Sequence, residues 1–358
     1  IFLTAPEALR SSGKTINCGD SASTLRFMTA VAALAQGRTV LTGNPGLLKR
    51  PVGPLVRALR DLEVPCADEK GYPPIIIDGG GIRGGKTRLP GDVSSQFITA
   101  LLLAGPLAQG ETTLDVTSPL ESKPYVDLTL DIVKKHEIAI HVSESSDHFN
   151  IPAPQQYTQC NHSVPGDFSS AAFLLAAAAV TNSRLKVTNL PVENRKAPDH
   201  GILRVLEKMG ITLRIGEGSV EVLSSELHGD EIEASDMPDL VPVTAAIASV
   251  AEGETRILKA SRLRLKESDR LSALSVELKK LGATITEYPD ALHIRGVKSL
   301  KGSTVDPHND HRIAMAAAVA ALRADGPTRI INAECVRKSY PTFADDLRRI
   351  GVEVQVAR

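Results

Sequence analysis

The sequence predicts a layered α/β protein built from one repeated unit, and two regularities support this fold class. The first is a series of aspartates in turns before Ala-rich helices, with steps of 72, 75, 72 and 71 residues. The second is a basic residue before a further helix, with steps of 73, 73, 70 and 72 residues. Self-similarity at a fixed period indicates a repeat architecture, and helices alternating with strands favour α/β or α+β layers. The aspartates are Asp20, Asp92, Asp167, Asp239 and Asp310, and the basic residues are Arg50, Lys123, Lys196, Lys266 and Lys338.

The order of elements within a unit follows from the period of the apolar residues. The first helix is expected at 25–36, 97–107, 171–180, 243–250 and 313–322, and the strand after it at 39–42, 112–116, 185–187, 255–258 and 328–331. The second helix is expected at 52–61, 126–135, 202–209, 271–281 and 343–350. Alternating residues after it, for instance at 283–286 and 352–355, predict a further strand. The unit is therefore strand–helix–strand–helix–strand–strand.

The repeat also predicts a kind of site. Helices related by rotation point the same way, so several helix N-termini come together. Helix N-termini carry partial positive charge and free N–H groups, and such a convergence favours a ligand with several anionic groups. For any single turn, a Ser or Asp that only caps its helix is the alternative interpretation.

Composition excludes several classes of protein. The chain of 358 residues has 41 Lys and Arg against 42 Asp and Glu, which argues against a generally cationic nucleic-acid binder. Its 3% of aromatic residues and lack of Trp argue against aromatic platforms that stack the bases of single-stranded nucleic acid. The four cysteines form no CxxC pair, so we expect neither disulfides nor a metal site. The longest apolar runs are about half the ~20 residues of a membrane span, and no secretory signal is visible, so we expect a cytoplasmic protein without membrane contact.

One common motif is present by letter only. Residues 79–84 match GxGxxG, but a dinucleotide site needs a helix directly after the motif. Only a short stretch separates these glycines from the next repeat turn. We therefore expect a Gly-rich turn between strands.

Six motifs together resemble those of the 5-enolpyruvylshikimate-3-phosphate synthase family. They follow one another in the order of that family and extend over nearly the whole chain. The motifs are KRPVG at 49–53, SSQFITALL at 94–102, SKPYVD at 122–127, KESDRL at 266–271, NDHRIAM at 309–315 and KSYP at 338–341.

The resemblance implies a fold and a reaction. The fold is a two-domain inverse α/β barrel built from βαβαββ units, with domains at 1–164 and 165–358. The reaction transfers the enolpyruvyl group of phosphoenolpyruvate to the 5-hydroxyl of shikimate 3-phosphate by addition and elimination, and it releases phosphate. No cofactor and no metal are implied, the two substrates are the only partners, and we expect a monomer.

The resemblance also implies roles for individual residues. Asp239 matches the base for the 5-hydroxyl, Glu267 the acid that protonates the C3 methylene, and Lys266 a group that assists both proton transfer and shikimate 3-phosphate binding. His311 orients Arg312 or is structural. Shikimate 3-phosphate is expected at Ser94, Ser95, Gln96, Ser122, Tyr125, Asp239 and Lys266. Phosphoenolpyruvate is expected at Ala22, Arg50, Gln96, Arg270, Arg312 and Lys338.

The chain departs from the family pattern in two places. Ala22 stands where many members have Gly, and its methyl group would crowd the phosphate, so we expect weak binding of longer inhibitors such as glyphosate. The upstream unit of the family, with its Lys-Ser…Arg motif, does not precede Cys18. Five units of an expected six are present, which implies either that the protein is longer than this sequence or that it has lost one unit, and we expect the activity of the chain as written to suffer.

Two other functions stay open on the sequence. One is a non-catalytic module of the same fold that binds a phosphorylated metabolite, and the retained Asp239, Glu267 and Lys266 weigh against it. The other is the enolpyruvyl transferase that acts on UDP-N-acetylglucosamine. That enzyme uses a loop cysteine, and no cysteine here lies in a comparable motif.

Overall fold

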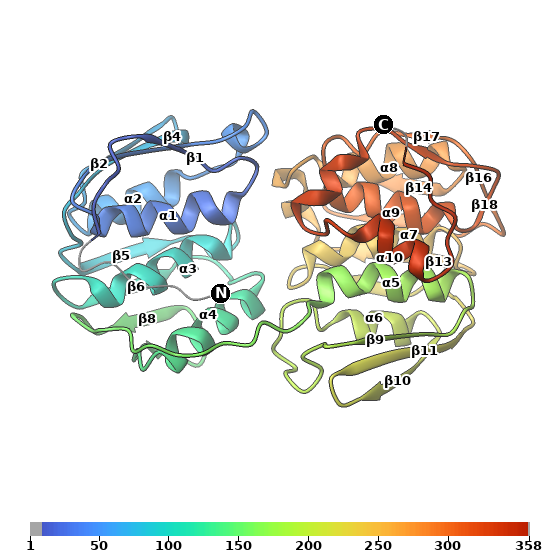
Figure 1. Cartoon of the computed structure of the whole chain (residues 1–358), viewed down its shortest axis with the longest axis horizontal. Helices are drawn as coiled ribbons and strands as arrows, with labels where there is room; N and C mark the ends of the chain where they lie inside the picture. Colours follow the sequence, from blue (N-terminus) through green and yellow to red (C-terminus); the bar gives the residue numbers. More distant parts are fainter. Residues whose placement is uncertain (1–8, 357–358) are drawn as a thin grey trace. The chain divides into compact units, whose positions relative to one another are not determined.

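A computed structural model describes residues 9–356 of the chain (Figure 1). Its contacts divide the chain into two compact units, Ile1–His162 and Ser163–Arg358. Each unit has its own hydrophobic core, and we describe the two in turn.

The first unit contains the predicted repeat twice. In both copies the first strand pairs parallel with the second, and the last two strands pair antiparallel, which gives the sheet orders β1-β2-β4-β3 and β5-β6-β8-β7. The first copy consists of β1 (Thr15–Asn17), α1 (Ala22–Leu34), β2 (Gly37–Thr42), α2 (Gly53–Asp61), β3 (Cys66–Glu69) and β4 (Tyr72–Gly79). The second consists of β5 (Gly85–Leu89), α3 (Ser95–Ala104), β6 (Thr112–Val116), α4 (Lys123–Lys135), β7 (His141–Val142) and β8 (His148–Ile151). The glycines at 79–84 form the turn between β4 and β5, as predicted.

The second unit contains one complete copy and two modified ones. The complete copy, with sheet order β12-β13-β15-β14, consists of β12 (Glu231–Glu233), α7 (Val241–Ala248), β13 (Glu254–Leu258), α8 (Arg270–Lys280), β14 (Thr284–Glu287) and β15 (Leu292–Arg295). The copy before it has α5 (Phe168–Val180), β9 (Leu185–Thr188), α6 (Ile202–Lys208), β10 (Ile211–Gly216) and β11 (Ser219–Ser225). The last copy has β16 (Leu300–Lys301), β17 (Thr304–Val305), α9 (His311–Ala321), β18 (Ala324–Asp325), β19 (Arg329–Ile330) and α10 (Phe343–Arg349).

Two of the predicted strands in this unit need correction. Residues 352–355 alternate in sequence, yet they form no strand, and within residues 9–356 they pair with no other strand. The strand predicted at 328–331 is only β19, because the parallel pairing with the preceding strand is split into two short ladders, β16 with β18 and β17 with β19. Alternating apolar and polar residues give a segment one face that can be buried. The segment forms a strand only where the edge of a neighbouring strand supplies backbone hydrogen bonds.

Small side chains let the central helices of the second unit approach one another closely. Helices α5, α7 and α9 are rich in Ala and pack against one another (Figure 1). Every residue of α7 is buried, so this helix is covered on all sides. Extra volume at such a packed position costs about 1–3 kcal/mol.

Capping residues fix where five of the helices begin. In each case a Ser or Asp side chain accepts a hydrogen bond from a backbone N–H of the first turn, which satisfies one of the donors left open at a helix N-terminus. These residues are Ser21 before α1, Ser94 before α3, Asp167 before α5, Asp269 before α8 and Asp310 before α9.

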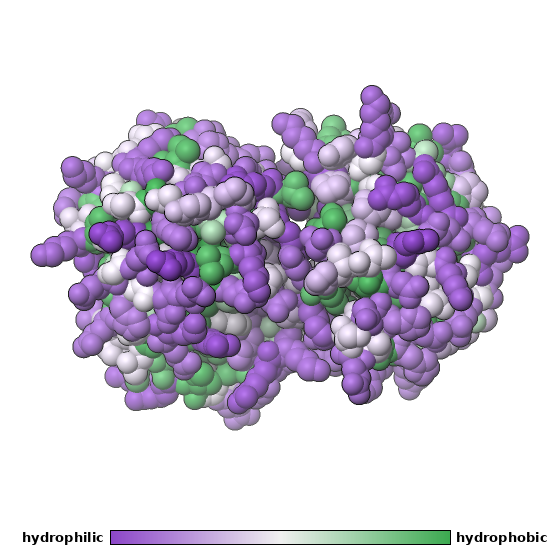
Figure 2. All heavy atoms as spheres, turned by 180° about the vertical axis from the view of Figure 1, so that it is seen from behind, coloured by the Kyte–Doolittle hydropathy of each residue, from purple (hydrophilic) through white to green (hydrophobic). Residues whose placement is uncertain are grey.

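Hydrophilic residues cover most of the face seen in Figure 2, and apolar residues are scattered over it in small groups. No helix within residues 9–356 is long and apolar enough to cross a membrane.

Candidate active site

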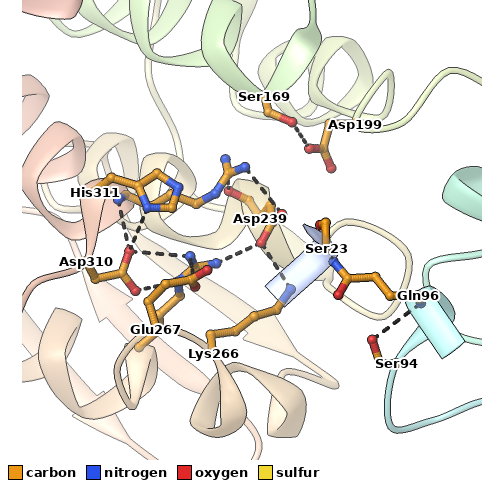
Figure 3. Close-up of polar contacts among 12 residues, drawn as sticks. Ser23, Ser94, Gln96, Ser169, Asp199, Asp239, Lys266, Glu267, Asp310 and His311 are labelled. Carbon is orange, nitrogen blue, oxygen red and sulfur yellow. Dashed lines mark hydrogen bonds and ion pairs between the residues drawn. The ribbon is translucent and has the colours of Figure 1, made fainter. Parts of the chain in front are cut away.

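Three helix starts of the second unit meet through their charged side chains (Figure 3). Asp239 lies in the short 3-10 helix Pro238–Leu240 that leads into α7, Arg270 is the first residue of α8, and Asp310 caps α9. Ion pairs join the three residues. The predicted convergence of helix N-termini is therefore present within this unit.

Arg270 is the centre of this group. Its side chain is only 1% exposed, and its guanidinium contacts three carboxylates. Nε donates to Oδ2 of Asp310 at 2.8 Å, Nη1 to Oδ1 of Asp239 at 2.7 Å, and Nη2 to Oε2 of Glu267 at 2.6 Å. A planar guanidinium has three nitrogens that donate hydrogen bonds in fixed directions, whereas an ammonium has a single nitrogen with rotatable donors. Arg270 therefore contacts both carboxylates that the family resemblance assigns to proton transfer.

Asp239 is held as a carboxylate. Burial raises the pKa of its carboxyl, but three neighbouring cations outweigh burial and hold that pKa well below its usual value. These cations are Arg312, Lys266 and Arg270. The side chain of Asp239 does not cap α7, so the capping interpretation of this residue is wrong.

Lys266 lies directly against this carboxylate, with its Nζ 3.2 Å from Oδ1 of Asp239. Burial lowers the pKa of Lys266, and the negative charge of Asp239 opposes that change only in part. The ammonium therefore gives up its proton more readily than an exposed lysine does.

The remaining charged groups lie at the start of α9 and at the end of the 3-10 helix Ala333–Lys338. Nη2 of Arg312 lies 3.3 Å from Oδ2 of Asp239, and Nζ of Lys338 donates to the backbone oxygen of Asn309 at 2.7 Å. His311 is buried, and burial together with the charges of Arg312 and Arg270 lowers its pKa to about 4. Its imidazole is therefore neutral near pH 7, with Nδ1 at 3.8 Å from Oδ1 of Asp310.

The first unit has its own polar cluster, centred on Arg26. Nη1 of this buried residue donates to Oγ of Ser94 at 3.0 Å and to Oε1 of Gln96 at 2.8 Å, and Nη2 donates to the backbone oxygen of Pro51 at 2.9 Å. Nε2 of Gln96 in turn donates to Oγ of Ser23 at 2.8 Å. The guanidinium of Arg26, from α1, thus joins the start of α3 to the turn before α2, and Gln96 extends the contact to Ser23 at the start of α1.

The other sequence-predicted residues of this unit lie at neighbouring helix starts. Ser95 is the first residue of α3, and Ala22 is the first residue of α1, with its methyl group buried. Arg50 is buried at the end of the 3-10 helix Leu47–Lys49, three residues before α2. Ser122 precedes α4 in a left-handed conformation (φ 55°), and its backbone oxygen accepts a hydrogen bond from the backbone N–H of Tyr125.

The sequence does not single out Arg26 and Asp310 of these clusters as site residues, nor a separate hydrogen-bonded pair at the start of α5. Arg26 interrupts the apolar pattern of α1, and a charged residue on a buried helix face is a signal that sequence alone provides. Asp310 was visible only as a capping aspartate. Ser169, in the first turn of α5, donates a hydrogen bond to the buried Asp199, and neither residue stood out from ordinary turn residues (Figure 3).

Metal ligands do not gather in the part of the chain that the structure describes. Within residues 9–356, no three His, Cys, Asp or Glu side chains are grouped so that they could hold a metal ion.

Comparisons with known proteins agree on one family. The family model of EPSP synthase (3-phosphoshikimate 1-carboxyvinyltransferase) matches residues 4–347. The protein named 3-phosphoshikimate 1-carboxyvinyltransferase in Methanococcoides burtonii is 46% identical over 344 residues, which cover 95% of this chain and 79% of that protein. The protein of the same name in Methanocaldococcus jannaschii is 40% identical over 353 residues, which cover 97% of this chain and 81% of that protein.

The fold is also that of a solved structure. EPSP synthase from Acinetobacter baumannii superposes with a TM-score of 0.77 at 28% identity, over 99% of this chain and 81% of that one. This match confirms the predicted fold class, the two-domain inverse α/β barrel. The chain belongs to the EPSP synthase family.

Proposed function

We propose that this chain transfers the enolpyruvyl group of phosphoenolpyruvate to the 5-hydroxyl of shikimate 3-phosphate, with release of phosphate, in the shikimate pathway. The observation that supports the proposal most directly is that Arg270 forms ion pairs with both Asp239 and Glu267. Addition and elimination need a base for the hydroxyl and an acid for the methylene carbon. Here the two carboxylates are held by a single buried cation.

In the addition, the 5-hydroxyl oxygen bonds to C2 of phosphoenolpyruvate, its proton passes to Asp239, and C3 takes a proton from Glu267. In the elimination, the bond from C2 to the phosphate oxygen breaks, C3 returns its proton to Glu267, and the proton held by Asp239 leaves with the phosphate. Enolpyruvylshikimate 3-phosphate and phosphate result, and the atoms balance without a cofactor. Lys266 contacts Asp239 and has a lowered pKa, which suits a group that assists proton transfer.

The substrates carry two phosphates and two carboxylates, and each unit offers side chains suited to them. For shikimate 3-phosphate we propose Ser94, Ser95, Gln96, Ser122, Tyr125, Asp239 and Lys266. For phosphoenolpyruvate we propose Ala22, Arg50, Gln96, Arg270, Arg312 and Lys338. Arginine is the suitable residue for the carboxylate because its fork matches two oxygens at once.

A phosphate-release assay tests this function. The chain, alone and preceded by the upstream unit of a relative, receives phosphoenolpyruvate with either shikimate 3-phosphate or UDP-N-acetylglucosamine. We expect phosphate release with shikimate 3-phosphate only. In Asp239→Asn and Glu267→Gln, kcat should fall about 100-fold or more, because each loses one proton-transfer group. Absence of turnover in both versions defeats the proposal, and binding without turnover favours the non-catalytic module.

The proposal also includes the domain boundaries, the oligomeric state and the location of the protein. We propose domains at 1–164 and 165–358, a monomer as the active species and the cytoplasm as its location. Light scattering after size exclusion measures the mass of the particle. A mass twice that of the 38.1 kDa chain would refute the monomer.

A further inference from the structure

A second buried carboxylate lies on the helix that carries Arg270. Glu277 of α8 has a side chain only 1% exposed, and both of its oxygens are engaged. Oε1 lies 3.0 Å from Nε2 of His308, and Oε2 accepts from the backbone N–H of Asp306 at 2.9 Å. Nζ of Lys280 donates to both oxygens at 2.8 Å. The proposed reaction uses none of these contacts.

The segment that Glu277 contacts is the turn between β17 and α9. His308 and Asn309 both have positive φ, 52° and 57°, which residues other than glycine seldom adopt. Two successive residues in this region cost free energy, so surrounding contacts must hold the turn in place. Glu277 supplies two of them, one to a backbone N–H and one to the His308 ring.

This turn leads directly into the candidate active site. Asn309 presents the oxygen that accepts from Lys338, and the next residue, Asp310, accepts from Nε of Arg270. Arg270 and Glu277 are seven residues apart, which is about two helical turns, so they lie on one face of α8. Helix α8 therefore contacts the turn at both ends. Glu277 binds Asp306 at the start of the turn, and Arg270 binds Asp310 directly after the end of the turn.

We propose that Glu277 is a positioning residue for phosphoenolpyruvate: it fixes the 306–309 turn and thereby places Lys338 and Arg312. This inference rests on the proposed function. It predicts that loss of the carboxylate weakens phosphoenolpyruvate binding more than shikimate 3-phosphate binding, because Lys338 and Arg312, which the turn places, are both proposed for phosphoenolpyruvate.

The test compares Glu277→Leu with Glu277→Gln in steady-state kinetics. Leucine has similar volume and no acceptor, whereas glutamine can still accept from Asp306 and donate to His308. For Glu277→Leu we expect KM for phosphoenolpyruvate to rise about tenfold, with KM for shikimate 3-phosphate changed less than twofold. Glu277→Gln should restore KM to within about threefold of the unsubstituted chain. Equal changes in both KM values, or no rescue by glutamine, overturn the proposal.

Two further variants separate this role from general stability. Lys280→Met removes a partner of Glu277 that does not touch the turn, and it should leave both KM values unchanged. His308→Ala removes a partly exposed contact and should raise KM for phosphoenolpyruvate about threefold, so it decides the matter if Glu277→Leu does not fold. An unchanged KM in a folded His308→Ala contradicts the proposal.

A measurement independent of turnover keeps the inference separate from the proposed function. Amide hydrogen exchange reports on residues 306–310 in the unliganded chain. If amides 306–310 exchange faster in Glu277→Leu while the exchange rates of strands β12 to β15 stay unchanged, Glu277 fixes the turn. This result would support the inference even if the unsubstituted chain shows no turnover. Unchanged exchange in this segment overturns it.

Discussion

Arg270 is the buried cation on which three carboxylates of the second unit depend, and its replacement by lysine tests that dependence. Lysine keeps the positive charge but has one nitrogen in place of the planar fork. The four hydrogen bonds of 2.6 to 3.3 Å to Asp310, Asp239 and Glu267 cannot all be made from one ammonium. At least one carboxylate is then left in a buried place without its cation.

The size of the effect follows from burial. Loss of one partner of a buried ion pair costs about 3–5 kcal/mol. Since lysine retains part of the pairing, we expect Arg270→Lys to lower the free energy of unfolding by about 3 kcal/mol. We also expect kcat to fall about 100-fold, because Asp239 and Glu267 are displaced. Urea denaturation and phosphate release measure the two quantities.

Arg264 provides the matched control. It also pairs with two carboxylates, Asp269 and Glu287, at 2.8 and 3.0 Å, but its side chain is 30% exposed. Partly exposed ion pairs contribute about 1 kcal/mol or less, so Arg264→Lys should change stability by no more than that and leave kcat unchanged. If Arg270→Lys is as mild as Arg264→Lys, Arg270 is not the centre of the cluster.

Three further predictions concern single groups. Ala22→Gly removes the methyl group at the start of α1 and should lower the inhibition constant of glyphosate about tenfold; equal constants refute the steric reasoning. His311 has a folded pKa of about 4, below its usual value of about 6.5, so its contribution to stability is complete above pH 6.5 and is lost as the pH falls toward 4. Compared with His311→Asn, the unsubstituted chain should lose about 1.4 kcal/mol per pH unit in that interval, and parallel pH curves contradict this. Arg312→Gln removes a cation that lowers the pKa of Asp239, so the acidic limb of the kcat profile should move to higher pH; an unmoved limb excludes Asp239 as the titrating group.

The repeat made most of the fold predictable. Each unit places small or β-branched residues at the same spacing, so the helices α1, α3, α5, α7 and α9 were found within a few residues of their ends. The predictions that failed are those that depend on how strands pair. Residues 352–355 alternate as well as 284–287 do, but only the latter lie beside a strand edge, at β15. Sequence gives the period of a segment and leaves open which edge it meets.

The candidate site was predictable where a residue belongs to a motif and not where it acts through geometry. Glu267 and Arg270 share one motif, and the structure joins them. Arg26 and Asp310 are as central to their clusters, yet their sequence signals, a charge in an apolar helix and a capping aspartate, are common in structural roles. Contacts between residues about 70 positions apart, such as Arg26 with Ser94, are set by tertiary packing.

Charge balance explains how a nearly neutral chain can serve anionic substrates. In the second unit, Arg270, Arg312 and Lys266 face Asp239, Glu267 and Asp310, so their formal charges cancel. Such a cluster is preorganised, and an arriving anion has to compete with a carboxylate of the protein. If a substrate carboxylate engages Arg312, the pull of that cation on Asp239 weakens and the pKa of Asp239 rises. Substrate binding would then itself turn a strongly ionised carboxylate into a better base, at the moment the hydroxyl proton must leave.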